Sequence, residues 1–108
     1  LGDVYKRQAH AYGYYYGALA LSTSERYVGR ALDYDSYAEA SQAARRACGY
    51  ADCKVVTRFA NGCGAIAESP SYWGFGNGSS LYSAQSEALY YSGSGAEIVY
   101  WACTSAHD

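Results

Sequence analysis

Histidine, cysteine and serine are the residues of this sequence that could supply nucleophilic catalysis. Such chemistry needs a hydroxyl or a thiol beside a base, which is usually histidine. The two histidines, His10 and His107, lie close to the two ends of the chain, where the backbone is commonly frayed. We therefore expect no catalytic residues and a protein that is not an enzyme.

Two short motifs could supply catalytic carboxylates or bind an ion. Asp33 and Asp35 alternate with Tyr34 and could form a carboxylate pair, although acids before Ser36 are also typical of a turn. This segment offers fewer oxygen ligands than calcium takes. The glycine-rich segment 74–78 precedes a predicted helix and could bind an anion. It lacks the lysine of a phosphate loop, so a bulged strand is the preferred interpretation. We expect no metal and no cofactor.

Aromatic residues are the most abundant candidates for binding, with 14 tyrosines and 2 tryptophans among 108 residues. They can pack in a core, or they can form an exposed patch of the types that are enriched at protein interfaces and stack on sugars. Both interpretations stay open. The candidate binding residues lie near the N-terminus and in the second half of the chain: Tyr12, Tyr14, Tyr15, Tyr16, Tyr72, Trp73 and Trp101.

The elements that must position these side chains follow an internal repeat. Gly-Ala-Leu-Ala-Leu-Ser at residues 17–22 returns as Gly-Ala-Ile-Ala-Glu-Ser at residues 64–69. A helical pattern over residues 36–49 returns over residues 80–93. Each half therefore reads as strand, strand, helix and strand.

This pattern predicts one α+β domain over residues 12–108, with repeats at 14–59 and 61–104. We expect about six short, mostly antiparallel strands with two helices packed on the sheet. The connections at residues 23–26 and 69–72 predict a hairpin in each half. Asn61-Gly62 is a strong tight-turn signal. We therefore expect the last strand of the first half to pair with the first strand of the second.

The two helices are defined by their ends and by small residues. Ser36 and Glu39 form a capping box, and Gly49 suits the left-handed position after a helix. Helical spacing predicts one buried stripe of alanines: Ala40, Ala43, Ala44 and Ala47. The second helix repeats this scheme with Ser80 as cap, Gly93 as stop, and an inward set of Leu81, Ala84 and Ala88.

Four cysteines without a Cys-x-x-Cys pair predict two disulfides rather than a zinc site. The positions of the second half that match Cys48 and Cys53 are Ser92 and Ala96, so both cysteines are absent together. Of the three possible pairings, this joint absence favours one. It joins Cys48 to Cys53 and Cys63 to Cys103. Disulfides are typical of oxidising compartments.

The start of the chain differs in character from the rest. Residues 1–8, LGDVYKRQ, resemble a translated sequencing-library adapter, and we expect them not to belong to the protein. Ala-His-Ala at residues 9–11 has the form of a signal-peptidase site. We expect that a signal peptide preceded it, and that the protein is secreted, periplasmic or part of the cell envelope.

Charge and hydropathy exclude other classes of function. A formal net charge of −2 argues against a nucleic-acid partner, because such proteins need a basic face. The chain has no apolar run that approaches the roughly 18 residues needed to span a bilayer.

Three segments together resemble a known family. They are Phe-Ala-Asn-Gly-Cys-Gly-Ala-Ile-Ala at residues 59–67, Trp-Gly-Phe-Gly at 73–76 and Trp-Ala-Cys-Thr at 101–104. In this order they are similar to the family catalogued as domain of unknown function 4189, found in small exported bacterial proteins. The resemblance implies export and a small globular fold, but no activity. Ser92 and Ala96 stand where the family pattern has a further cysteine pair.

Two functions from different classes follow. The first is a protein-binding module, such as an inhibitor or an immunity-type partner of an extracellular or periplasmic protein. The alternative is a domain that binds the cell envelope or its glycans through Tyr72, Trp73 and the N-terminal tyrosines. Exposure of Trp73 distinguishes them, since a fully buried indole cannot stack on a sugar.

Overall fold

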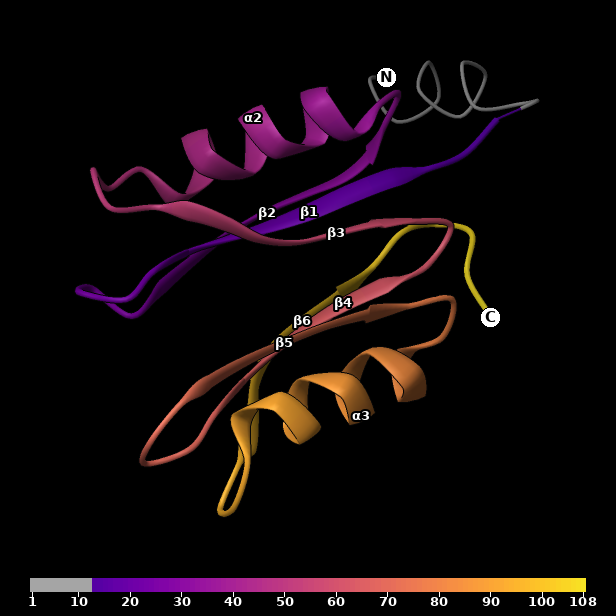
Figure 1. Cartoon of the computed structure of the whole chain (residues 1–108). Helices are drawn as coiled ribbons and strands as arrows, with labels where there is room; N and C mark the ends of the chain where they lie inside the picture. The colour runs from indigo at the N-terminus through magenta and orange to yellow at the C-terminus, as the bar shows by residue number, and fades with distance from the viewer. Residues whose placement is uncertain (1–12) are drawn as a thin grey trace.

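The computed structural model of the chain describes residues 13–108, and they form two successive strand–strand–helix–strand units (Figure 1). The first unit holds β1 (Tyr16–Ser22), β2 (Tyr27–Tyr34), α2 (Tyr37–Cys48) and β3 (Lys54–Ala60). The second holds β4 (Cys63–Glu68), β5 (Trp73–Gly78), α3 (Leu81–Ser92) and β6 (Glu97–Cys103). The α+β class and the order of elements in both halves are confirmed. The expectations for residues 1–8, residues 9–11 and Tyr12 lie outside the described residues.

The strands form two three-stranded antiparallel sheets, in the orders β2-β1-β3 and β5-β4-β6. The predicted pairing of the last strand of the first half with the first of the second is wrong. The Asn61-Gly62 turn instead passes the chain from one sheet to the other. Asn61 has a positive φ of 48°, and its side chain accepts a hydrogen bond from the Tyr15 amide at 2.8 Å. The Gly62 amide donates to Thr104 Oγ1 at 2.9 Å, so these contacts fasten the turn to other segments.

The two sheets face one another and the helices cover the outer faces, which gives four layers (Figure 1). Strand alternation explains this arrangement, because successive side chains point to opposite faces of a sheet. In β1, Leu19 and Leu21 pack between the sheets, whereas Ala18 and Ala20 pack beneath α2. In β4, Ile66 joins the inter-sheet cluster, whereas its neighbouring alanines pack beneath α3. Large side chains therefore join the two units, and small ones receive the helices.

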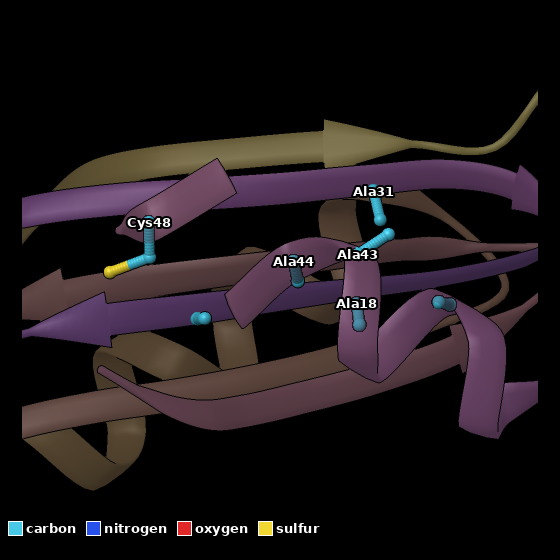
Figure 2. Packing of buried hydrophobic residues seen from close by; sticks show 7 residues of the cluster. Ala18, Ala31, Ala43, Ala44 and Cys48 are labelled. Carbon is cyan, nitrogen blue, oxygen red and sulfur yellow. The ribbon is translucent and has the colours of Figure 1, made fainter. Parts of the chain in front are cut away.

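The buried stripe of α2 differs from the predicted one at a single position. Ala43 and Ala44 are buried against the sheet, but Ala47 is exposed, and Cys48 takes its place in the cluster (Figure 2). The cause is the close approach of the last turn to β2. A Cβ on Gly29 would lie 2.2 Å from the Cys48 amide nitrogen, so the helix turns this position inward.

Both disulfides are confirmed. Cys48 and Cys53 close the turn between α2 and β3, and Cys63 is bonded to its register partner Cys103 on the neighbouring strand. In the part of the chain that the structure describes, no helix combines the length and the apolar character needed to cross a bilayer.

Candidate functional site: an aromatic helix face

The residues that could have been catalytic hold the C-terminal tail in place. The tail after β6 was expected to fray, but the Asp33 carboxylate accepts hydrogen bonds from the amide and the hydroxyl of Ser105. The Asp108 amide donates to the Ser79 carbonyl at 2.7 Å. His107 Nδ1 lies 2.7 Å from the Thr104 carbonyl oxygen. His10 lies outside the described residues.

The glycine-rich segment 74–78 lies in β5, and α3 packs directly on this strand. A Cβ on Gly74 would lie 2.1 Å from the Ala88 carbonyl oxygen, and one on Gly76 would lie 2.2 Å from the Ala84 carbonyl oxygen. These glycines therefore let the helix backbone approach the strand. The strand pairs with β4 in continuous register, so the expected bulge is wrong.

One group in residues 13–108 has the side-chain types of a metal site. The sulfurs of Cys63 and Cys103 and a ring nitrogen of His107 all lie within 4.8 Å of one another. The two sulfurs are bonded to each other, however, at 2.08 Å. Since the thiolate is the form of cysteine that binds metals, the closed disulfide offers neither sulfur as such a ligand.

The candidate aromatics near the N-terminus form a small ring cluster. Tyr14 is 58% exposed, and its ring centroid lies 6.1 Å from that of Tyr16. The Tyr16 ring is half-buried and meets the Tyr37 ring at 4.7 Å. The Arg58 guanidinium lies over Tyr37 at 5.7 Å. Tyr15 is also half-buried, and its carbonyl accepts a hydrogen bond from the Asn61 amide.

The candidates at residues 72 and 73 lie elsewhere. Tyr72 is 68% exposed, but Trp73 is half-buried against the inter-sheet cluster. The Arg26 guanidinium, which lies over the indole at 5.6 Å, also pairs with Glu68. That hydrogen bond lowers the pKa of the Glu68 carboxyl.

Strand register separates these two groups of aromatics. Tyr16 is opposite Ala60, next to the turn that joins the sheets, whereas Trp73 is opposite Glu68 at the far end of β4. The predicted N-terminal and second-half aromatics therefore do not form one platform.

The candidate binding residues did not include the aromatic residues on the outer face of α3. Tyr82 and Tyr90 are 82% and 79% exposed, and the Tyr90 and Tyr91 rings meet edge to face at 5.2 Å. We call the exposed set Tyr82, Leu89, Tyr90 and Tyr91 the tyrosine face. Its signal was the spacing of 82, 89 and 90, which places these residues opposite the inward Ala84 and Ala88.

Trp101 lies on the same side of its sheet. It is opposite Ala65, whose side chain packs beneath α3, while the residues on either side of Trp101 pack between the sheets. The indole is 49% exposed because α3 lies mainly over β5 and β4.

The helix of the first unit presents a different surface. Gln42, Arg45 and Arg46 are exposed on α2, and with the turn that follows they line an open hollow of about 480 Å³. Two smaller hollows, of about 410 and 210 Å³, contain Arg26 and Arg58 respectively. The described lining residues of these three hollows include no histidine and no cysteine.

Comparison with known proteins finds relatives of this chain in mycobacteria. A sequence model of the family described as domain of unknown function (DUF4189) matches residues 16–103. Protein Rv1269c of Mycobacterium tuberculosis is 42% identical over 88 residues, which are 82% of this chain and 68% of that protein. Uncharacterized protein Rv1813c of the same species is 38% identical over 89 residues, which are 82% of this chain and 60% of that protein. The NMR structure of Rv1813c superimposes with a TM-score of 0.68 and 38% sequence identity, covering 82% of this chain and 74% of that one.

Proposed function

This chain belongs to the DUF4189 family, and from that premise we propose that it is an exported, non-enzymatic module that binds another protein through the tyrosine face. The observation that carries the proposal is the composition of that face. Exposed Tyr82, Tyr90 and Tyr91 follow one helix of a small domain, and tyrosine is a residue type enriched where proteins bind one another.

The build of the domain suits such a role. Two disulfides and a packed four-layer arrangement present α3 on a firm support, which limits the ordering cost on binding. Disulfides persist in oxidising compartments, so the partner would be an extracellular or periplasmic protein. A small rigid domain of this kind fits an inhibitor or an immunity-type partner of a secreted enzyme.

The test is affinity capture from the culture filtrate of a mycobacterium, the genus of the relatives. Wild-type protein is compared with the variant Tyr90→Ser/Tyr91→Ser. The matched control is Tyr27→Ser/Tyr50→Ser, which removes another exposed tyrosine pair, with ring centroids 5.8 Å apart, from the first unit. We expect one protein to be retained by wild type and control but not by the α3 variant. Equal retention of that protein by wild type and by both variants would contradict the proposal.

The alternative function is binding to envelope glycans. The ring cluster of Tyr14, Tyr16 and Tyr37 favours it, because exposed aromatic rings can stack on sugars. Because Trp73 is half-buried, glycan stacking on its indole has less support than stacking on this cluster. If the wild-type protein sediments with purified cell wall and the Tyr14→Ser variant does not, this alternative is favoured over the first.

A further inference from the structure

Charge is divided unevenly between the two units. All six lysines and arginines among residues 13–108 lie before residue 60, whereas residues 60–108 contain four carboxylates and no lysine or arginine. On the outer face of α2, Arg45 and Arg46 are exposed. On α3 the single charged residue is Glu87, and exposed Glu97 begins the strand that follows. The tyrosine face therefore lies in the negatively charged half of the molecule.

Aromatic rings attract cations, because the face of the ring carries partial negative charge. Within residues 13–108 that attraction occurs at two places. Arg26 lies over Trp73 and Arg58 over Tyr37, at 5.6 and 5.7 Å from the ring centroids. Both arginines come from the first unit. No lysine or arginine of residues 13–108 is found over the rings of the tyrosine face.

We propose that the tyrosine face binds an arginine-rich segment of a partner protein, an inference that rests on the function proposed above. The guanidinium groups would stack on Tyr82, Tyr90 and Tyr91, as the chain's own arginines do on Trp73 and Tyr37. Glu87, which lies three positions before Tyr90 and four before Tyr91 on α3, supplies a carboxylate oxygen for a further guanidinium while its Oε1 accepts the Asn77 amide. The absence of lysine and arginine from residues 60–108 leaves no fixed positive charge in this unit to repel a basic segment.

The experiment titrates the isotopically labelled full chain with three short peptides and follows amide signals by NMR. The peptides have equal length and differ only in having arginine, glutamine or glutamate at the same positions. We expect the arginine peptide alone to shift signals of α3 and β6, with an affinity that falls as salt is raised. Glu87→Gln, which keeps an acceptor for the Asn77 amide, should weaken binding and flatten its salt dependence.

Paired tyrosine variants then locate the site. Tyr90→Ser/Tyr91→Ser removes two ring contacts and should weaken binding by about 5- to 30-fold, if each contact contributes about 0.5–1 kcal/mol. The control Tyr27→Ser/Tyr50→Ser should leave the affinity unchanged. Both pairs are exposed, so neither substitution removes core packing.

Several results would overturn the inference. One is equal binding of the arginine and glutamine peptides, and another is a set of shifts that maps to the acidic residues of the first unit. If no peptide binds but culture-filtrate capture retains an acidic or neutral protein through α3, the inference fails while the proposed function stands. If no peptide binds and capture retains nothing, both fail.

Discussion

The two units share one architecture but fasten the end of their helices with different chemistry. In the first unit, Cys48 at the end of α2 is bonded to Cys53 across the following turn. In the second, the position equivalent to Cys48 is Ser92, which is fully buried at the end of α3. Its hydroxyl donates to the Tyr72 carbonyl at 2.8 Å. A hydrogen bond to the neighbouring hairpin thus stands where the first unit has a covalent bridge.

A second pair of equivalent residues, Ser22 and Ser69, also differs in the group that accepts its hydrogen bond. Ser22 ends β1, and its hydroxyl donates to the Asp52 carboxylate at 2.7 Å. Ser69 follows β4, and its hydroxyl donates to the Ser92 carbonyl at 2.7 Å. The first unit therefore uses an ionisable acceptor where the second uses the backbone.

The outer helix faces differ more than the inner ones. Beneath both helices most of the buried strand residues are alanine or glycine, because each helix lies so close to its sheet that larger side chains at these positions would clash. On the outside, Arg45 and Arg46 of α2 correspond to Leu89 and Tyr90 of α3. The comparison teaches that packing restrains the inner face of each unit and leaves the outer face free to acquire a separate role.

The largest difference between the units should come from their disulfides. Cys63 and Cys103 are 40 residues apart, and Cys48 and Cys53 are 5 apart. Because longer loops lose more entropy on closure, we expect Cys63→Ala/Cys103→Ala to cost about 4 kcal/mol and Cys48→Ala/Cys53→Ala about 2 kcal/mol. Urea melts of both variants measure this. Equal midpoints would contradict the ordering.

Close helix packing should be equally strict in both units. A Cβ on Gly29 or Gly74 would lie within 2.5 Å of helix backbone atoms. We expect Gly29→Ala and Gly74→Ala each to lower the free energy of unfolding by about 1–3 kcal/mol, because the helix must shift outward. Gly13→Ala is the control, since nothing lies within 4 Å of its Cβ position. If either variant has the same free energy of unfolding as Gly13→Ala, the helix over that glycine can move outward at little cost, which would contradict the prediction.

The buried hydroxyl of the second unit should contribute less than either bridge. Ser92→Ala leaves the Tyr72 carbonyl without this donor, and we expect a cost of about 1 kcal/mol. Ser86→Ala, on the exposed side of the same helix, should be nearly neutral. Thermal melts compare the two. No difference between them would mean that water replaces the lost bond.

Acid should weaken the Ser22–Asp52 hydrogen bond of the first unit, whereas its counterpart at Ser69 uses a backbone acceptor that does not titrate. The Ser22 hydroxyl, followed by the Ser24 amide, lowers the pKa of Asp52 in the folded chain. Its stabilisation is therefore complete above the unfolded pKa and is lost as pH falls through the folded pKa. We expect exchange of the Ser24 amide to accelerate at acid pH, and Asp52→Asn to flatten that dependence. Faster acid exchange of the Ser69 segment alone would contradict this.

Local signals predicted much of the fold because they act over a few residues. Ser36 and Ser80 cap their helices as expected, Gly49 is left-handed and β1 alternates, but the reciprocal capping box forms at Ser80 and Ser83 and not at Ser36 and Glu39. The disulfide pairing followed from comparison of the repeats. The turn at Asn61 was misread because a tight-turn signal gives the path of the chain, and the partners of the flanking strands depend on residues far away.

The candidate site was predicted less well for the same reason. Trp73 is half-buried in part because it packs between two sheets and beneath Arg26, which lies 47 positions earlier in the sequence. The α3 tyrosines had the spacing of an outward face, but a chain with two phenylalanines and no methionine also needs tyrosines in its core. The predicted inward set of α3 indicated which side of that helix meets solvent, and the burial of Ala84 and Ala88 confirms it.

The sequence by itself determined the two repeated units, their helix ends and the cysteine pairs, because these depend on short-range hydrogen bonds and on spacing. The tertiary structure decided that the units form two facing sheets, and that one helix face carries arginines and the other tyrosines into solvent. Exposure is a property of packing between distant segments. The aromatic residues therefore acquired their separate roles, as core or as surface, only when the sheets came together.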